Sequence, residues 1–226
     1  MRRILICSDR SWTERLELSE RLLSEVDVYY ARTQPELEDA TAKGIMFDFI
    51  FFPFWSRIID ESIYAQYKAV IFHMTDLPHG RGGSPLQNLI LEGATSTKIS
   101  AIECAEVLDG GAVYLKKPLS LEGSAQEIFE RAVPVISEMI EEIVYTNPLP
   151  TPQSGTATRF RRRKPEQSSI PFELTSQGAY DFIRMLDAET YPKAFIRHGT
   201  LKIVFSEARL IGDELTVKAV IEEEAK

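Results

Sequence analysis

The chain has 226 residues, of which 44% are hydrophobic and 27% charged, and its formal net charge is −8 at pH 7. This composition is typical of a globular protein and excludes extensive disorder. The length allows one substantial core, or one domain with a small appendage. The acidic balance argues against nucleic acid or an anionic membrane as the main partner, although a local basic patch can still bind phosphates.

The N-terminal residues and the cysteines indicate the cellular setting. Cys7 and Cys104 are the two cysteines, and they provide neither a disulfide framework nor a metal-ligand spacing. The apolar run at 4–7 is too short for a signal-peptide core or a membrane span. A reducing cytoplasm is the expected location.

Strands alternate with helices in the first 72 residues. Apolar runs predict strands at 4–7, 27–31, 47–54 and 69–72, separated by helices at 12–23, 35–43 and 58–67. This alternation predicts an α/β, Rossmann-like domain with a mostly parallel sheet and right-handed crossovers. Ligands bind at the carboxyl ends of strands in such sheets, and His73 follows the fourth predicted strand directly.

The second half of the chain changes character after residue 145. Before that point we expect helices at 85–91, 100–108 and 124–145 and a strand at 111–115; after it we expect a helix at 176–186 and strands at 202–205, 207–210 and 216–221. The segment 146–158 holds three prolines and many small polar residues, which predicts a linker. The expected regions are a catalytic domain at 1–150, a linker with a basic segment at 151–175, and a small helix and β-hairpin extension at 176–226.

His73 is the residue on which a chemical interpretation depends. Imidazole exchanges a proton near neutral pH, and the turn Gly80-Arg81-Gly82-Gly83 lets a ligand approach the backbone closely. The alternative for His73 is a ring that is merely hydrogen-bonded at a strand end, and the alternative for Arg81 is a surface turn residue. His79 lies six residues away across Pro78, which is poor spacing for ligands, so no metal site is expected.

Asp109 is the second candidate, in the sequence Leu108-Asp109-Gly110-Gly111. Ordinary turn formation is one interpretation of an Asp-Gly pair. The other is a carboxylate that orients a histidine and stabilises its charged form. The sequence alone does not place Asp109 near His73.

Four elements together resemble the formyltransferases that use N10-formyltetrahydrofolate. HMTDLPHGRGGSP resembles the segment that carries the family's catalytic histidine, which puts His73 in that role, and LDGGAVYL resembles the Leu-Asp-x-Gly element, which puts Asp109 in the role of the catalytic aspartate. RFRRRKPEQS and DFIRMLDAETYPKAF are similar to segments that follow the family's catalytic domain. The matched elements occur in the family's order and cover most of residues 47–200.

Within this family, the short chain is most similar to the compact sugar formyltransferases. The resemblance implies transfer of a formyl group from N10-formyltetrahydrofolate, without a metal, to a UDP- or dTDP-linked 4-amino sugar in surface polysaccharide biosynthesis. The acidic C-terminal sequence EEEAK would repel tRNA, so neither a nucleic acid nor a membrane is the expected partner. A homodimer is left open by the sequence. The competing interpretations are a module acting on a carrier-bound aminoacyl group and a non-catalytic binding protein.

The chain departs from the family at one position. The family asparagine two residues before the histidine falls at Ile71, which cannot donate a hydrogen bond to a developing oxyanion. Gln87 and Asn88 are the nearest amides in sequence that could replace it. A backbone N–H, a bound water, or a purely structural role for both amides on a helix are the alternatives.

The resemblance also implies where the two substrates bind. The folate is expected against Phe52, Pro53, Phe54 and Trp55 and along the segment from Ile102 to Leu108, although these aromatics also suit plain core packing. Arg10, Arg81, Gly82 and Gly83 are expected to contact substrate phosphates, with Arg161 to Arg163 as weaker candidates because charge runs are commonly solvated. Arg184, beside Asp181, can instead form a structural ion pair.

Overall fold

The computed structural model describes residues 1–189 and 191–223, and these residues form two compact units. The first unit comprises Met1–Gly82, Thr97–Leu119 and Glu130–Arg159, and the second comprises the remaining segments. The two units therefore interleave along the chain, whereas the expected regions follow one another. The C-terminal residues 224–226, on which part of the tRNA-repulsion argument rests, lie outside the described residues.

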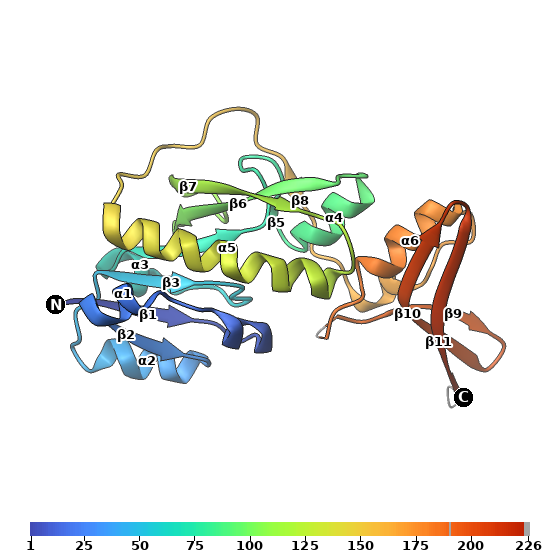
Figure 1. Cartoon of the computed structure of the whole chain (residues 1–226), viewed down its shortest axis with the longest axis horizontal. Helices are drawn as coiled ribbons and strands as arrows, with labels where there is room; N and C mark the ends of the chain where they lie inside the picture. The colour runs from blue at the N-terminus through green and yellow to red at the C-terminus, as the bar shows by residue number, and fades with distance from the viewer. Residues whose placement is uncertain (190, 224–226) are drawn as a thin grey trace. The chain divides into compact units, whose positions relative to one another are not determined.

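The first unit is built on a six-stranded sheet (Figure 1). Its strand order is β2-β1-β3-β4-β6-β7, with bounds β1 Arg2–Cys7, β2 Val26–Ala31, β3 Phe49–Phe52, β4 Ala69–His73, β6 Ser96–Glu103 and β7 Val113–Ser120. The β1–β2, β1–β3 and β3–β4 pairs are parallel and the β4–β6 pair is antiparallel. The predicted α/β class with a mostly parallel sheet is confirmed.

Helices cover the apolar residues of this sheet. They are η1 Ser11–Arg15, α1 Glu20–Glu25, α2 Gln34–Ala42, α3 Glu61–Gln66 and α5 Ala125–Thr146. Leu5 and Cys7 alternate along β1 and share one buried cluster with Leu37 of α2 and Ile63 of α3. Along α5, residues such as Phe129, Val133, Ile136, Ile140 and Ile143 repeat at helical spacing and are all buried. The predicted long core-covering helix is confirmed.

Two predicted helices of this unit are wrong. Residues 12–23 divide into η1 and α1, because Ser19 caps α1 by accepting a hydrogen bond from the backbone N–H of Leu22. Residues 100–108 begin in strand β6, whose residues Ile99 to Ile102 are fully buried. A short apolar run that is buried on both faces has no period that separates a helix from a strand. Cys104 therefore follows a strand and does not lie in a helix.

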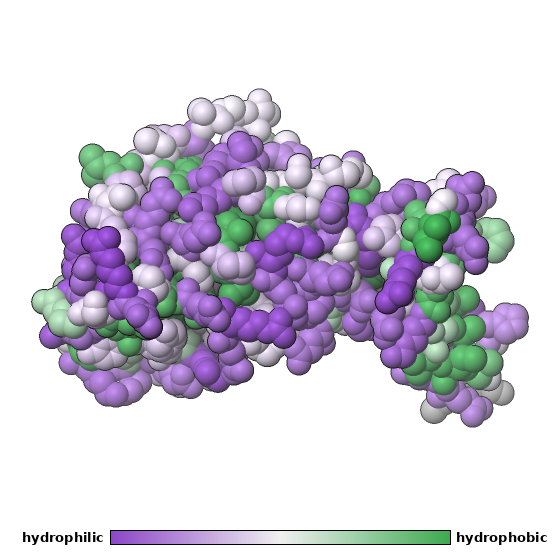
Figure 2. Space-filling view, in the orientation of Figure 1, coloured by the Kyte–Doolittle hydropathy of each residue, from purple (hydrophilic) through white to green (hydrophobic). Residues whose placement is uncertain are grey.

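Two short strands, β5 Arg81–Gly82 and β8 Arg159–Phe160, pair in a two-stranded sheet. The second unit holds the other remaining elements. They are α4 Pro85–Leu91, η2 Pro165–Ser168, α6 Ser176–Arg184, β9 Ala194–His198, β10 Leu201–Ile211 and β11 Glu214–Glu223. The last three form an antiparallel sheet, in which β9 was not predicted and the strands predicted at 202–205 and 207–210 form the single strand β10. A turn at Gly212-Asp213 joins β10 to β11. Hydrophobic side chains gather on the surface of this sheet (Figure 2), where Ile211, Val220 and Ile221 are exposed. The expected C-terminal helix and β-hairpin are confirmed.

Two further observations concern the described residues as a whole. None of the helices within 1–189 and 191–223 is long and apolar enough to cross a bilayer. Over the same ranges, no group of three or more His, Cys, Asp or Glu side chains is arranged to hold a metal ion.

Candidate functional site

His73 and Asp109 meet at the carboxyl end of β4. Nδ1 of His73 lies 3.5 Å from Oδ2 of Asp109, and both side chains are buried. His73 ends strand β4, while Asp109 lies in the turn between β6 and β7, 36 residues further along the chain. The structure thus brings together the two residues that the sequence could only place separately.

The other ring nitrogen of His73 is also in contact with an oxygen. Nε2 lies 2.8 Å from the backbone carbonyl oxygen of Gly80. Both ring nitrogens therefore face acceptors, and a neutral imidazole has only one N–H to donate. A neutral His73 ring can therefore donate to only one of these two oxygens at a time.

The turn that carries Asp109 has an uncommon backbone conformation. Asp109 has φ 52°, in the left-handed region, and its Oδ2 also accepts a 2.8 Å hydrogen bond from the backbone N–H of Gly82. At Gly111, a Cβ would lie 1.9 Å from the carbonyl oxygen of Glu103. Close backbone approach, and not only turn propensity, requires glycine there.

The glycine-rich turn lies directly against this pair. Gly80 and Gly82 have φ of 71° and 105°, conformations that favour glycine. The backbone N–H of Gly80 donates to the Thr158 hydroxyl, and the backbone N–H of Arg81 donates to the Thr158 carbonyl. The turn is therefore tied to the segment that follows α5, and both Gly80 and Gly82 contact the His73–Asp109 pair.

Ile71, which occupies the position of the family asparagine, lies on strand β4 together with His73. Ile71 and His73 are two residues apart on β4, so their side chains lie on the same face of the sheet. Ile71 pairs with Phe52 of β3 and Ile102 of β6. The neighbour of His73 on this face is therefore apolar, as the sequence implied.

The predicted amides Gln87 and Asn88 belong to α4 in the second unit. Gln87 is buried, and its Oε1 has no hydrogen-bond partner among the described residues. Nδ2 of Asn88 donates to the carbonyl oxygens of Gly83 and Ser84. Asn88 thus closes the turn before α4, and a role for either amide toward an oxyanion stays a prediction.

The predicted folate residues differ in exposure. Phe52 and Ile102 are fully buried and Pro53 is buried, whereas Leu108 is 64% exposed and Phe54 and Trp55 are half-buried. Nε1 of Trp55 has no hydrogen-bond partner among the described residues. Trp55 thus keeps part of its aromatic surface exposed, while its Nε1 is buried.

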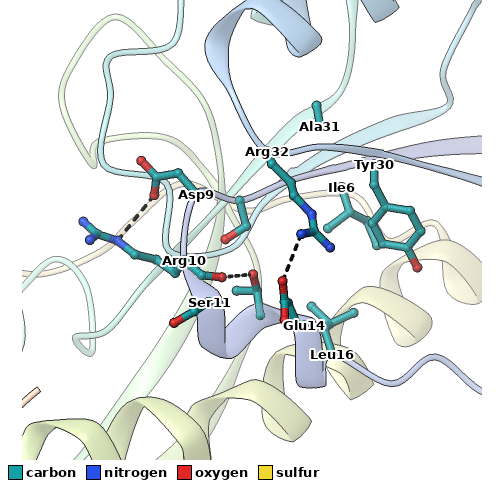
Figure 3. A pocket seen from close by; sticks show the side chains of 11 residues that line it. Ile6, Asp9, Arg10, Ser11, Glu14, Leu16, Tyr30, Ala31 and Arg32 are labelled. Carbon is teal, nitrogen blue, oxygen red and sulfur yellow. Dashed lines mark hydrogen bonds and ion pairs between the residues drawn. The ribbon is translucent and has the colours of Figure 1, made fainter. Parts of the chain in front are cut away.

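Arg10 lines a hollow of about 570 Å³ at the carboxyl ends of β1 and β2 (Figure 3). Its Nε lies 3.3 Å from Asp9, and across the hollow Arg32 donates to Glu14 at 2.9 Å. The hydroxyl of Ser8 also lines the hollow and has no hydrogen-bond partner in the described part of the chain. Each of these two arginines already faces a carboxylate, so a phosphate would have to compete with it.

Neither cysteine can supply a thiolate nucleophile. Burial raises the pKa of Cys104 to about 11, with the charge of Asp109 adding to the effect. Burial likewise raises the pKa of Cys7 far above its usual range. A thiol is the nucleophile only when deprotonated, so burial disfavours the reactive form of both cysteines.

Gln153 is a residue of the site that the sequence did not indicate. Its amide nitrogen donates to the carbonyl oxygens of Asp109 and Gly111, both at 2.8 Å, and its oxygen accepts from Arg81. It lies in the proline-rich segment after α5, where a polar side chain is expected to be solvated. No local pattern could have identified it, because its partners are 42 to 72 residues away.

Comparisons with known proteins show which family this chain resembles. A family model described as methionyl-tRNA formyltransferase, C-terminal domain, matches residues 165–222. The solved structure of methionyl-tRNA formyltransferase from Clostridium thermocellum is 41% identical, covers 99% of this chain and 100% of its own, and superposes with a TM-score of 0.94. A curated methionyl-tRNA formyltransferase from Sulfurihydrogenibium is 22% identical over 70% of this chain and 53% of its own length. The chain spans about half the length of the curated relatives that it matches.

Two other groups of solved structures share the fold alone. HypX from Aquifex aeolicus in complex with tetrahydrofolic acid is 22% identical over 91% of this chain and 37% of its own, with a TM-score of 0.74. A sugar N-formyltransferase from Shewanella is 13% identical over the full length of both chains, with a TM-score of 0.67.

Two expectations about the substrate are contradicted by these comparisons. The nucleotide-linked amino sugar and the exclusion of nucleic acid are both wrong, because the 41% identical relative and the matching C-terminal domain are those of methionyl-tRNA formyltransferases. The short length of this chain does not indicate a sugar substrate, because the match with the methionyl-tRNA formyltransferase from Clostridium thermocellum covers 100% of that chain. The argument against nucleic acid relied on the net charge of the whole chain, and it gave too little weight to the basic run at 159–164.

Proposed function

Because this chain belongs to the formyltransferase family, we propose that it transfers a formyl group from N10-formyltetrahydrofolate to the amino group of methionyl-tRNA. The observation that carries the proposal is the 41% identity with a methionyl-tRNA formyltransferase over essentially the whole of both chains. The buried His73–Asp109 pair, which the sequence resemblance puts in the place of the family's catalytic residues, supports the same activity.

His73 and Asp109 have distinct roles in this proposal. N10-formyltetrahydrofolate supplies the formyl carbon. The attacking amine must be unprotonated, and it loses a further proton as the new C–N bond forms and the bond to N10 breaks, so His73 accepts that proton and returns one to N10. Asp109 holds the ring in place and stabilises its charged form.

His73 needs a free ring nitrogen for this step. In the structure Nε2 contacts the Gly80 carbonyl and Nδ1 faces Asp109. Gly80 belongs to a turn of conformationally permissive glycines, so the Gly80 contact is the one we expect the substrate amine to replace. Asp109 then remains as the partner of Nδ1.

Trp55 is our proposed contact for the folate. Its indole is half-buried beyond β3, and Nε1 has no partner among the described residues. A pterin offers a ring face for aromatic contact with the exposed part of this indole. In contrast, Phe52 and Ile102 would have to leave the core to touch a ligand.

The basic segment 159–164 is our proposed contact for the tRNA. Arg159, Arg161, Arg162 and Lys164 are exposed. Arginine and lysine bind phosphate oxygens irrespective of sequence. They provide a local attraction for a polyanion on a chain whose net charge is −8.

The test is a transfer assay with the purified protein. N10-formyltetrahydrofolate is incubated with charged methionyl-tRNA, and formylmethionine is measured by mass spectrometry after deacylation. Free methionine, at the same concentration, tests whether the tRNA part is needed. Formylmethionine from methionyl-tRNA alone supports the proposal; equal formylation of both amines overturns the tRNA assignment, and formylation of neither overturns the activity.

A further inference from the structure

The two partners of His73 lie on two different loops. Gly80, which contacts Nε2, belongs to the turn after β4, and Asp109, which faces Nδ1, belongs to the turn between β6 and β7. Loops of this kind move independently unless something joins them. The distance from Asp109 to His73 therefore depends on whatever ties these two turns together.

Gln153 makes that connection with its full hydrogen-bonding capacity. Its Nε2 donates to the carbonyl oxygens of Asp109 and Gly111, at 2.8 Å each. Its Oε1 accepts from Nε and Nη2 of Arg81, at 3.1 and 2.7 Å. The orientation of the amide is fixed by chemistry, because the carbonyls only accept and the guanidinium only donates.

A third contact completes the connection between the turns. The backbone N–H of Gly82, the residue after Arg81, donates to the Asp109 carboxylate at 2.8 Å. Gln153 thus fixes the backbone of Asp109 on one side and the side chain of Arg81 on the other. Its two amide hydrogens engage carbonyl oxygens on either side of Gly110, in the turn where Asp109 has its left-handed conformation.

We propose that Gln153 is a positioning residue, which holds the Gly80–Gly82 turn and the Asp109 turn in register so that Asp109 stays beside Nδ1 of His73. The catalytic consequence of this role rests on the proposed formyl transfer, whereas its structural consequence does not. Gln153 itself touches neither ring nitrogen of His73. Its loss should therefore lower the rate of the chemical step and leave substrate binding largely unchanged.

The test substitutes Gln153→Glu in the full chain. Glutamate has nearly the same shape and keeps an acceptor for Arg81, but it removes both N–H donors and directs a second oxygen at the Asp109 and Gly111 carbonyls. We expect kcat for formylation of methionyl-tRNA to fall by roughly 10- to 100-fold, with both KM values changed by less than about threefold. Ser154→Glu adds the same charge at the exposed neighbouring position and should keep the wild-type kcat.

Hydrogen exchange tests the connection without relying on activity. In Gln153→Glu, peptides containing residues 79–83 and 107–111 should exchange about tenfold faster than in wild type, while a peptide from α5 should not change. Wild-type exchange and wild-type kcat in a folded Gln153→Glu protein would overturn the proposal. Faster exchange in both turns of Gln153→Glu, combined with a wild-type protein that transfers no formyl group, would leave the structural role standing and refute only the proposed function. A variant that fails to fold is replaced by Gln153→Met, judged by the same two measurements.

Discussion

Nδ1 of His73 lies 3.5 Å from a carboxylate oxygen of Asp109, and each side chain is less than one-tenth exposed. Burial away from water strengthens the interaction of a carboxylate with a ring that becomes charged. It also means that removing the carboxylate leaves the charged ring without compensation. The two residues should therefore depend on each other more than a pair on the surface would.

The first prediction concerns this dependence. His73→Asn should lower kcat for formyl transfer by on the order of 10²- to 10⁴-fold, because no group remains to accept the proton of the amine. Asp109→Asn should have an effect of similar size, and the double variant should be little worse than either single variant. Initial rates of tetrahydrofolate release measure all three proteins.

A third histidine provides the control for this comparison. His198 is exposed at the end of β9, and His198→Asn should leave kcat within about twofold of wild type. Strictly additive losses for His73 and Asp109 would show that the two residues act separately.

The second prediction concerns the position two residues before His73. Ile71→Asn restores an amide on the strand face that carries His73 and should raise kcat by about tenfold or more if the oxyanion of this chain lacks a side-chain donor. The same change should lower the free energy of unfolding by about 1–2 kcal/mol, because a polar group enters the space between Phe52 and Ile102. Ile71→Leu is the control, and equal kcat for the two variants would mean that another donor already serves.

The extent to which sequence predicted this site follows from the range of its interactions. His73 was identifiable because it ends a strand, and the carboxyl end of a parallel strand is a general ligand position. Asp109 was identifiable through its Asp-Gly turn and a family motif. Their contact, however, depends on how β4 and β6 pair, and the segment that contains β6 was expected to be a helix.

Gln153 shows what the sequence could not provide. Its role depends on backbone carbonyls in one turn and an arginine in another, and a glutamine that binds carbonyls has no characteristic sequence neighbours. Similarly, Arg81 seemed available to a substrate because glycines flank it, yet its guanidinium donates twice to Gln153. Long-range polar contacts of this kind become visible only in three dimensions.

The third prediction separates two reasons why a position requires glycine, namely lack of space for a Cβ and a left-handed backbone conformation. Gly111→Ala should lower the free energy of unfolding by at least about 2 kcal/mol, because its Cβ would lie 1.9 Å from the Glu103 carbonyl oxygen and the backbone must move. Gly44→Ala faces open space but has φ 70°, and it should cost about 1 kcal/mol. Urea unfolding measures both, and equal costs would contradict the steric argument. Gly111→Ala should additionally lower kcat, since Gly111 borders the Asp109 turn.

The fourth prediction concerns Arg184, a buried cation in the second unit. Its Nε donates to Asp181 at 2.6 Å, and Nη1 donates to the carbonyl oxygens of Leu121 and Gly123. The structural ion pair that the sequence allowed is confirmed. Lysine keeps the charge but cannot reach these separate acceptors, so Arg184→Lys should destabilise the protein by about 2–3 kcal/mol.

A second arginine tests whether this loss is specific. Arg209 is exposed on β10, and Arg209→Lys should change the free energy of unfolding by less than about 0.5 kcal/mol. Matching losses for the two substitutions in urea unfolding would show that the buried carbonyl contacts of Arg184 contribute nothing measurable.

The fifth prediction concerns the pH dependence of stability at Asp76. Burial raises the pKa of this carboxyl, but hydrogen bonds from Lys116 and Lys98 outweigh that effect and hold the pKa below the ordinary 3.8. A carboxyl whose pKa is lowered by folding adds stability above its unfolded pKa and loses it as pH falls through the folded pKa. The wild type should therefore exceed Asp76→Asn in free energy of unfolding at pH 7, and the difference should disappear as the pH falls through the lowered folded pKa of Asp76.

Since the Asp76 side chain is 45% exposed, solvent screening should keep the difference under about 1 kcal/mol. Asp213→Asn, in the exposed turn between β10 and β11, is the control, and a difference for Asp76→Asn that grows as the pH falls would reverse the assigned sign.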